Sequence, residues 1–178
     1  QSAGFTHWAK LNNLKQAAKT MNFLIEHGIS SYGELESKLA VISTRRDTVH
    51  AEIKRVESRS TELALVMKHA GTYRQLKPLY VRYRKSNDKE KFLRGHESEI
   101  ILFEAAAREL KRLGAVPLPT TESMKTELTN LAAEKERLLA EYKAARTEAQ
   151  EYETVKQNVD ALLTVPKEQE QQRRHELE

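Results

Sequence analysis

The chain has 178 residues, a formal net charge of +4, 31% charged side chains and no cysteine. Without cysteine, a disulfide framework and a thiolate metal site are both excluded, and this composition is typical of a reducing compartment. Aromatic residues make up only 6% of the chain, which holds six glycines and four prolines. A composition so rich in Ala, Glu, Lys, Leu and Arg predicts an all-α protein of long helices and coiled coils.

Membrane and targeting signals are missing from the sequence. No apolar run approaches the roughly 20 residues that a membrane-spanning helix needs, and no signal-peptide pattern opens the chain. We therefore expect a cytoplasmic protein that does not insert into a membrane. Because the chain begins at Gln1 and not at a methionine, we also expect it to be a fragment of a longer protein.

The first predicted element is a helix within residues 1–29. Thr6 is a suitable N-cap, and Gly28 stands where a glycine commonly ends a helix. Apolar residues recur at helical spacing and predict one buried face, which would contain Trp8, Leu11, Leu14 or Ala18, Met21, Leu24 and Ile25.

Residues 30–70 are predicted to form the first arm of an antiparallel coiled coil. Ser31 and Glu34 make a capping-box pattern ahead of a helix at about 32–70. We expect Gly71 to interrupt this helix and Pro78 to end or kink the next one. The heptad positions of the arm are Leu35, Leu39, Ile42, Arg46, Val49, Ile53, Val56, Ser60, Leu63, Met67 and Ala70.

Residues 71–120 are predicted to form a compact helical tip that joins two arms. A helix from Asn87 or Asp88 to Gly114 fits the apolar spacing, and a proline-containing loop follows it. Thr120 or Thr121 can cap the second arm, residues 121–164, and we expect Pro166 to end it ahead of a mobile polar tail, residues 165–178. The heptad positions of this arm are Met124, Leu128, Leu131, Lys135, Leu138, Tyr142, Ala145, Ala149, Tyr152, Lys156, Val159 and Leu163.

The two arms, about 32–70 and 121–163, match each other in length, which favours a long antiparallel stalk. A three-helix bundle is the alternative, because the apolar face of the middle helix could also lie along one arm. The pairing predicted from Leu35 opposite Leu163 sets Ile42 against Lys156, Val49 against Ala149, Val56 against Tyr142 and Leu63 against Lys135. A slip by one whole heptad keeps the same pattern of facing positions. We expect a monomer, with weak dimers through the first helix as the alternative.

The middle of the chain carries an unusual basic and aromatic segment between Tyr73 and His96. Eight Lys and Arg residues oppose two carboxylates there, which gives a local net charge of +6. Such cations can neutralise phosphates while tyrosine rings stack on bases. The other interpretation is that the aromatic rings form a small core and that the cations are its solvated rim. The candidate contact residues, named the tip cluster here, are Arg74, Lys77, Tyr80, Arg82, Tyr83, Arg84, Lys85, Lys89, Lys91 and Arg94.

No pattern for catalysis or for a cofactor is found in the sequence. The six histidines are scattered and do not have the spacing of metal ligands on one helix. His96, Glu97 and Glu99 form the only local group of metal-binding residue types, and such a group on a helix is usually a solvated face. The glycines are isolated, so no phosphate-binding loop is expected. We expect no catalytic, cofactor or metal site, and no enzyme activity in this chain.

Several strings of the chain resemble the C-terminal region of relaxases, the DNA-nicking proteins of conjugative transposons and mobilisable elements. They are HWAKLNNLKQAAKTMNFLIEHGISSYGEL, LKPLY, HESEIILFEAAARELK and EYETVKQNVDALL, and they extend over nearly the whole chain. In that family a separate nuclease domain carries a catalytic tyrosine and a histidine-bound metal, and no H-x-H motif is present here. The resemblance implies a non-catalytic region that contacts transfer-origin DNA or an acidic-faced protein of the transfer machinery, such as its coupling protein. The alternative is a purely structural coiled-coil spacer or a scaffold for protein interactions.

Overall fold

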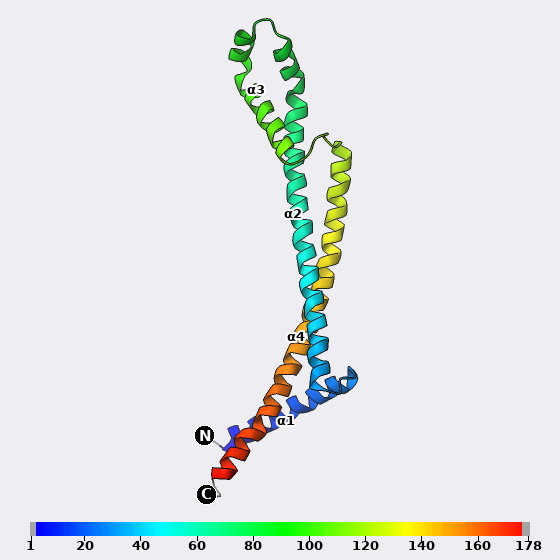
Figure 1. Ribbon diagram of the computed structural model, residues 1–178, viewed down its shortest axis with the longest axis vertical. Coiled ribbons are helices and arrows are strands. Elements are labelled where there is room, and N and C mark those ends of the chain that lie inside the picture. Colours follow the sequence, from blue (N-terminus) through cyan, green and yellow to red (C-terminus); the bar gives the residue numbers. More distant parts are fainter. Residues whose placement is uncertain (1–2, 176–178) are drawn as a thin grey trace. The chain divides into compact units, whose positions relative to one another are not determined.

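The protein is described by a computed structural model, which gives the backbone of residues 3–175 and the side chains of residues 12–164. This part of the chain is all-α, as predicted, and consists of α1 (Ala3–Glu26), α2 (Tyr32–Lys85), α3 (Lys89–Arg112) and α4 (Thr121–His175) (Figure 1). The helices divide into two compact units, residues 1–50 with 140–178 and residues 51–139. Both α2 and α4 contribute to each unit. In the described residues, no helix is long and apolar enough to cross a membrane.

Two glycines end helices as predicted. The Gly28 amide donates to the Ile25 carbonyl and the next amide donates to that of Leu24, with a φ of 61° at Gly28. Gly114, at a φ of 68°, closes α3 with the same pair of hydrogen bonds, to Lys111 and Leu110. This pair of backbone hydrogen bonds is the Schellman motif. Its left-handed residue is usually glycine, because glycine has no Cβ that would clash in this conformation.

The N-terminal caps also follow the sequence. Ser31 Oγ accepts from the Glu34 amide at 3.2 Å, and Glu34 Oε2 accepts from the Ser30 amide at 2.7 Å. The Ser30 hydroxyl also donates to this carboxylate, at 2.9 Å. Because the Ser30 amide and hydroxyl both favour the charged form, they lower the pKa of Glu34. Thr120 is the residue that caps α4, since its Oγ1 accepts from the Ser123 amide at 3.1 Å.

The predicted interruptions of the long helices are wrong. Helix α2 continues through Gly71 and Pro78 to Lys85. Tyr73 and Tyr80, on either side of the proline, both stack on Phe103. This packing offsets the proline's cost of about 3 kcal/mol. Helix α4 likewise runs past Pro166 to His175, where a polar tail was expected.

In the unit of residues 1–50 and 140–178, helices α1, α2 and α4 share one core. Its buried residues are Ile29, Leu35, Ile42, Ala149, Tyr152 and Val155. The Phe23 ring of α1 meets the Tyr152 ring of α4 edge-on, with 5.0 Å between centroids. The α1 residue Thr20 is 3% exposed and accepts a hydrogen bond from Asn158 of α4.

The face that α1 turns inward differs from the predicted one except at Leu24, a predicted member that packs against the core. Thr20 is buried and Phe23 and Leu24 are half-buried, whereas Leu14, Met21 and Ile25 are 68%, 59% and 69% exposed. The predicted members Trp8 and Leu11 lie outside the described side chains. On the observed face, Thr20 accepts a hydrogen bond from Asn158, and Phe23 packs on Tyr152 of α4. Apolar spacing within α1 does not reveal either contact, because both partners are on α4.

In the unit of residues 51–139, helix α2 has two successive partners. Its earlier part pairs with α4 in antiparallel fashion, with Arg55 bound to Glu134 and Arg59 bound to Glu127. Its later part packs on α3 through rings beginning at Tyr73. Figure 1 shows α3 and α4 alongside successive stretches of α2 in this unit.

The predicted register of α2 against α4 is wrong by about one heptad. Lys156 lies 3.7 Å from Glu36 and Lys135 lies 2.8 Å from Glu57, whereas Ile42 and Leu63 were the expected neighbours. The prediction took Leu163 as an anchor, and this residue is 60% exposed. It also left Met124 without a partner on the first arm. Met124 is 1% exposed, so the observed register buries a large side chain that the predicted one leaves unpaired.

Candidate nucleic-acid interface

A short turn places the two basic stretches of the tip cluster side by side. Asp88 caps α3, accepting from the Lys91 amide at 3.0 Å, and the Ser86 hydroxyl donates to the Asp88 carbonyl at 3.0 Å. The chain thereby reverses within three residues between the end of α2 and the start of α3. The resulting α2–α3 hairpin carries all ten residues of the tip cluster.

Aromatic rings hold this hairpin together. The Phe103 ring of α3 stacks on Tyr80 at 4.2 Å and on Tyr73 at 4.8 Å between centroids. Farther along, Tyr83 lies 6.1 Å from Phe92. All of these rings except Phe103 are half-buried, and Phe103 is 6% exposed. Tyr80 and Tyr83 therefore pack between helices, which agrees with the interpretation of the rings as a small core.

A groove of about 370 Å³ lies along the side of the hairpin. Its floor combines the Tyr73, Tyr80 and Phe103 rings with the small side chain of Ala107, and Val81 completes the apolar lining. Three cations of the tip cluster border it, namely Lys77, Arg84 and Lys85. The groove thus offers apolar ring surface next to positive charge, the combination that suits a nucleotide.

The cations of the tip cluster are exposed, and most have no acidic partner. Arg82 lies over the Phe92 ring and Lys77 over the Tyr73 ring, at 5.9 and 5.8 Å from the centroids. Among the side chains that the structure describes, no salt bridge is formed by Lys77, Arg82, Arg84, Lys85, Lys89, Lys91 or Arg94. Seven positive charges on one hairpin are consequently left for solvent or a ligand.

Arg74 is the exception within the tip cluster. Its guanidinium donates to Thr121 Oγ1 at 2.6 Å and to the Pro119 carbonyl. These bonds tie α2 to the loop ahead of α4, so the side chain has a structural role. The distance of 45 residues between Arg74 and Pro119 hides this contact from sequence analysis.

The histidine and carboxylate residues singled out in the sequence, His96, Glu97 and Glu99, lie on α3. In the described part of the chain, no group of three or more potential metal ligands comes together. His96 interrupts the helical backbone of α3 with a φ of −143°, and its Nδ1 lies 3.6 Å from the Glu99 carboxylate, beyond hydrogen-bonding distance. The backbone of α3 is therefore kinked at His96.

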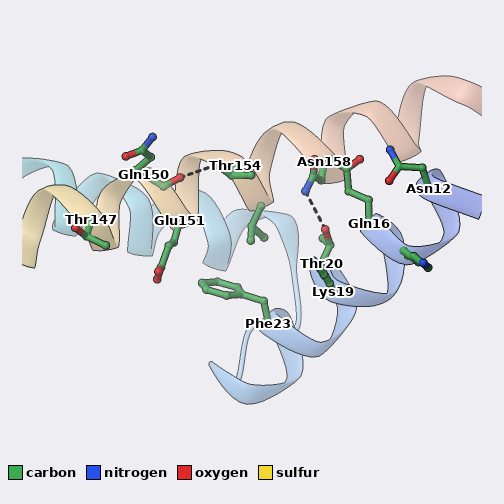
Figure 2. A pocket seen from close by; sticks show the side chains of 12 residues that line it. Asn12, Gln16, Lys19, Thr20, Phe23, Thr147, Gln150, Glu151, Thr154 and Asn158 are labelled. Carbon is green, nitrogen blue, oxygen red and sulfur yellow. Dashed lines mark hydrogen bonds between the residues drawn. The ribbon is translucent and has the colours of Figure 1, made fainter. Parts of the chain in front are cut away.

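Sequence reasoning missed a second concave surface, a groove of about 660 Å³ between α1 and α4 (Figure 2). Asn158 bridges its walls, accepting from Gln16 Nε2 at 2.7 Å and donating to Thr20 Oγ1 at 3.1 Å. Phe23 is one of the α1 side chains that line this groove, as Figure 2 shows. The polar contacts across this groove are made within the chain and mainly fix α1 on α4. Neither Thr20 nor Asn158 stands out in the sequence, because isolated polar residues on a helix usually face solvent.

No protein-family model, no curated protein and no solved structure matches this chain.

Proposed function

We propose that this chain is the non-catalytic accessory region of a conjugative relaxase and that its tip cluster contacts transfer-origin DNA. The observation that carries the proposal is the set of seven cations of the α2–α3 hairpin that form no salt bridge in the described residues, three of which border an aromatic groove. The resemblance of the sequence to relaxase C-terminal regions supports the choice of DNA mobilisation. In this proposal the α2–α4 pair is a stalk that presents the hairpin, and the protein acts in the cytoplasm.

The physical basis is the release of counterions from a phosphate backbone. Each Lys or Arg that neutralises a phosphate frees condensed cations, which favours binding and makes it steeply dependent on salt. Arg84 and Lys85 border the aromatic groove, so they can hold a backbone while a base lies against exposed ring edges. Arg82 is near enough to join them on the last turn of α2.

An acidic-faced protein of the transfer machinery would use the same charges. The second candidate function is a structural spacer or scaffold, and the observation in its favour is the paired charge along α2 and α4. Arg55, Arg59 and Lys135 each bind a carboxylate on the opposite helix. Such an arm holds two helices together without any ligand.

Binding of labelled transfer-origin DNA to the full chain, measured by fluorescence anisotropy, tests the proposal. The tip variant Arg82→Ala/Arg84→Ala/Lys85→Ala should bind single- and double-stranded oligonucleotides at least about tenfold more weakly, because three phosphate contacts are lost. The arm variant Arg45→Ala/Arg55→Ala/Arg59→Ala removes the same charge from paired positions and should bind nearly as well as the parent.

Equal losses in both variants would mean that net charge, not the hairpin, determines binding. Unchanged DNA affinity in the tip variant would remove the DNA function. If capture of the coupling protein is lost in that variant, the protein partner replaces DNA; if it too is unchanged, the structural spacer remains.

A further inference from the structure

Helix α1 carries an apolar stripe that nothing in the described structure covers. Leu14, Ala18, Met21 and Ile25 follow one another at steps of four, three and four residues, which is the spacing of a coiled-coil seam. All four are exposed, with Leu14, Met21 and Ile25 at 68%, 59% and 69%. Exposed apolar residues are ordinary when scattered, but a regular stripe indicates an interaction surface.

The arms show what such spacing does when a partner is present. Val56 and Leu63, at heptad positions of α2, are 0% and 2% exposed. The opposite side of α1 is already occupied, because Thr20 binds Asn158 and Phe23 packs on Tyr152.

Met21 and Ile25 border a groove of about 330 Å³ that Val159 and Leu163 of α4 also line. Within the described side chains, no helix covers the outer side of the stripe.

We propose that a second copy of this chain covers the stripe, with the two α1 helices antiparallel. In an antiparallel seam, Leu14 faces Ile25 of the partner subunit and Ala18 faces Met21 of the partner subunit. Each layer then contains at least one large side chain, so the packed volume varies less from layer to layer than in a parallel seam. A parallel seam would set alanine against alanine and leave a void.

Charge supports the same pairing. Lys15 and Glu26 are exposed, and neither forms a salt bridge within the described side chains. In the antiparallel seam, Lys15 and the partner's Glu26 lie on neighbouring outer positions, about 3 Å apart along the helix axis at 1.5 Å per residue. A two-fold axis produces this ion pair twice.

The seam is short, so the dimer should be weak. Residues 14–25 extend for only about 18 Å of helix, and four layers bury much less surface than a stable interface needs. A monomer–dimer equilibrium that depends on protein concentration is the expected behaviour. It does not depend on the function proposed for the tip cluster.

Disulfide crosslinking tests both the identity of the partner and the orientation of the seam. Because the chain has no native cysteine, every disulfide must come from an introduced residue. A mixture of Leu14→Cys and Ile25→Cys chains should form a mixed disulfide dimer in high yield under mild oxidation. Either chain by itself should crosslink no more than Val41→Cys, whose side chain is 70% exposed outside the stripe. Preferential crosslinking of Leu14→Cys chains with each other would overturn the antiparallel seam, and background yields throughout would overturn the second copy.

Sedimentation velocity across a concentration series supplies an independent readout. Ile25→Glu should remain monomeric, whereas Val41→Glu, a matched change at an exposed apolar site, should dimerise like the parent. Lys15→Glu should weaken the dimer several-fold, and Lys15→Glu/Glu26→Lys should restore it by exchanging the partners. Thermal unfolding checks that each variant is folded. A parent chain that is monomeric at all concentrations, or a double variant that stays as weak as Lys15→Glu, would contradict the inference.

Discussion

The two halves of the unit at residues 51–139 use positive charge in opposite ways. Where α2 pairs with α4, Arg55 binds Glu52 and Glu134, and Arg59 binds Glu127 at 2.7 Å. Where α2 pairs with α3, Arg84 and Lys85 border a groove and bind no carboxylate in the described residues. One continuous helix thus carries neutralised cations in one half and unneutralised cations in the other.

The difference concerns binding more than stability. An exposed salt bridge contributes only about 0–1 kcal/mol, so the paired half gains little from its ion pairs. Apolar contacts such as Val56 and Leu63, at 0% and 2% exposure, hold that half together. Unpaired like charges repel one another and disfavour the compact state. In the function that we propose, this positive array on the hairpin is the surface that meets a negatively charged ligand.

The largest expected effect is on the free energy of unfolding, and it should come from a buried residue of the paired half and not from the tip cations. Met124→Ala removes a side chain that is 1% exposed at the start of α4 and should lower the free energy of unfolding by about 2–5 kcal/mol. The tip triple variant should change it by less than about 0.5 kcal/mol, since these are exposed surface positions and alanine is a good helix former. Urea unfolding followed by circular dichroism measures both. Comparable losses would show that the tip cations also stabilise the fold.

Changing two glycines of the same unit to alanine should change stability by smaller amounts, with opposite signs at the two positions. Gly114 has a φ of 68°, a conformation in which an L-residue is strained. Gly114→Ala should therefore lower the free energy of unfolding by roughly 1–2 kcal/mol. Gly71→Ala should raise the free energy of unfolding by about 0.5–1 kcal/mol, because glycine is unfavourable inside a helix. A Cβ at this position meets nothing within 4 Å. The shifts in urea midpoint give the comparison. A loss at Gly71 would indicate that α2 needs flexibility ahead of the hairpin.

The smallest expected effect is on the pH dependence of stability in the unit of residues 1–50 and 140–178, where charged side chains also contact one another. The Tyr32 hydroxyl donates to Asp160 at 2.6 Å and Lys156 approaches it at 3.2 Å, and these contacts lower the pKa of Asp160. The stabilisation is present above the carboxyl's ordinary pKa and is lost as pH falls through the lowered one. Asp160→Asn should therefore lower the melting temperature slightly at pH 7 and leave it nearly unchanged near pH 2. A difference that persists at pH 2 would assign the effect to packing.

Local signals predicted much of this fold. Gly28, Gly114, Asp88 and Thr120 mark helix ends because each supplies a specific hydrogen bond or backbone conformation. Heptad spacing identified residues such as Leu35 and Val56 that are buried. These features depend on a few neighbouring residues, so a single sequence contains them.

Features set by distant contacts were not predictable. The heptad pattern repeats every seven residues, so it could not separate two registers, and the burial of Met124 decided between them. Stacking on Phe103 carried α2 past Pro78 against the local preference. In the tip cluster, composition pointed to all ten residues and left two interpretations of the rings open. The structure was needed to reveal the contact of Arg74 with Pro119 and the stacking of Tyr80 on Phe103.

The salt dependence of DNA binding tests the central claim most directly. Plotting log Kd against log salt concentration for the parent, tip and arm variants counts the phosphates that each neutralises. If Arg82, Arg84 and Lys85 contact phosphates, the slope for the tip variant should fall by about 2–3, at roughly 0.7–0.9 per contact. The arm variant should keep the parental slope. Identical slopes for parent and tip variant would contradict the account, because the unpaired cations of the hairpin would then make no contact with DNA.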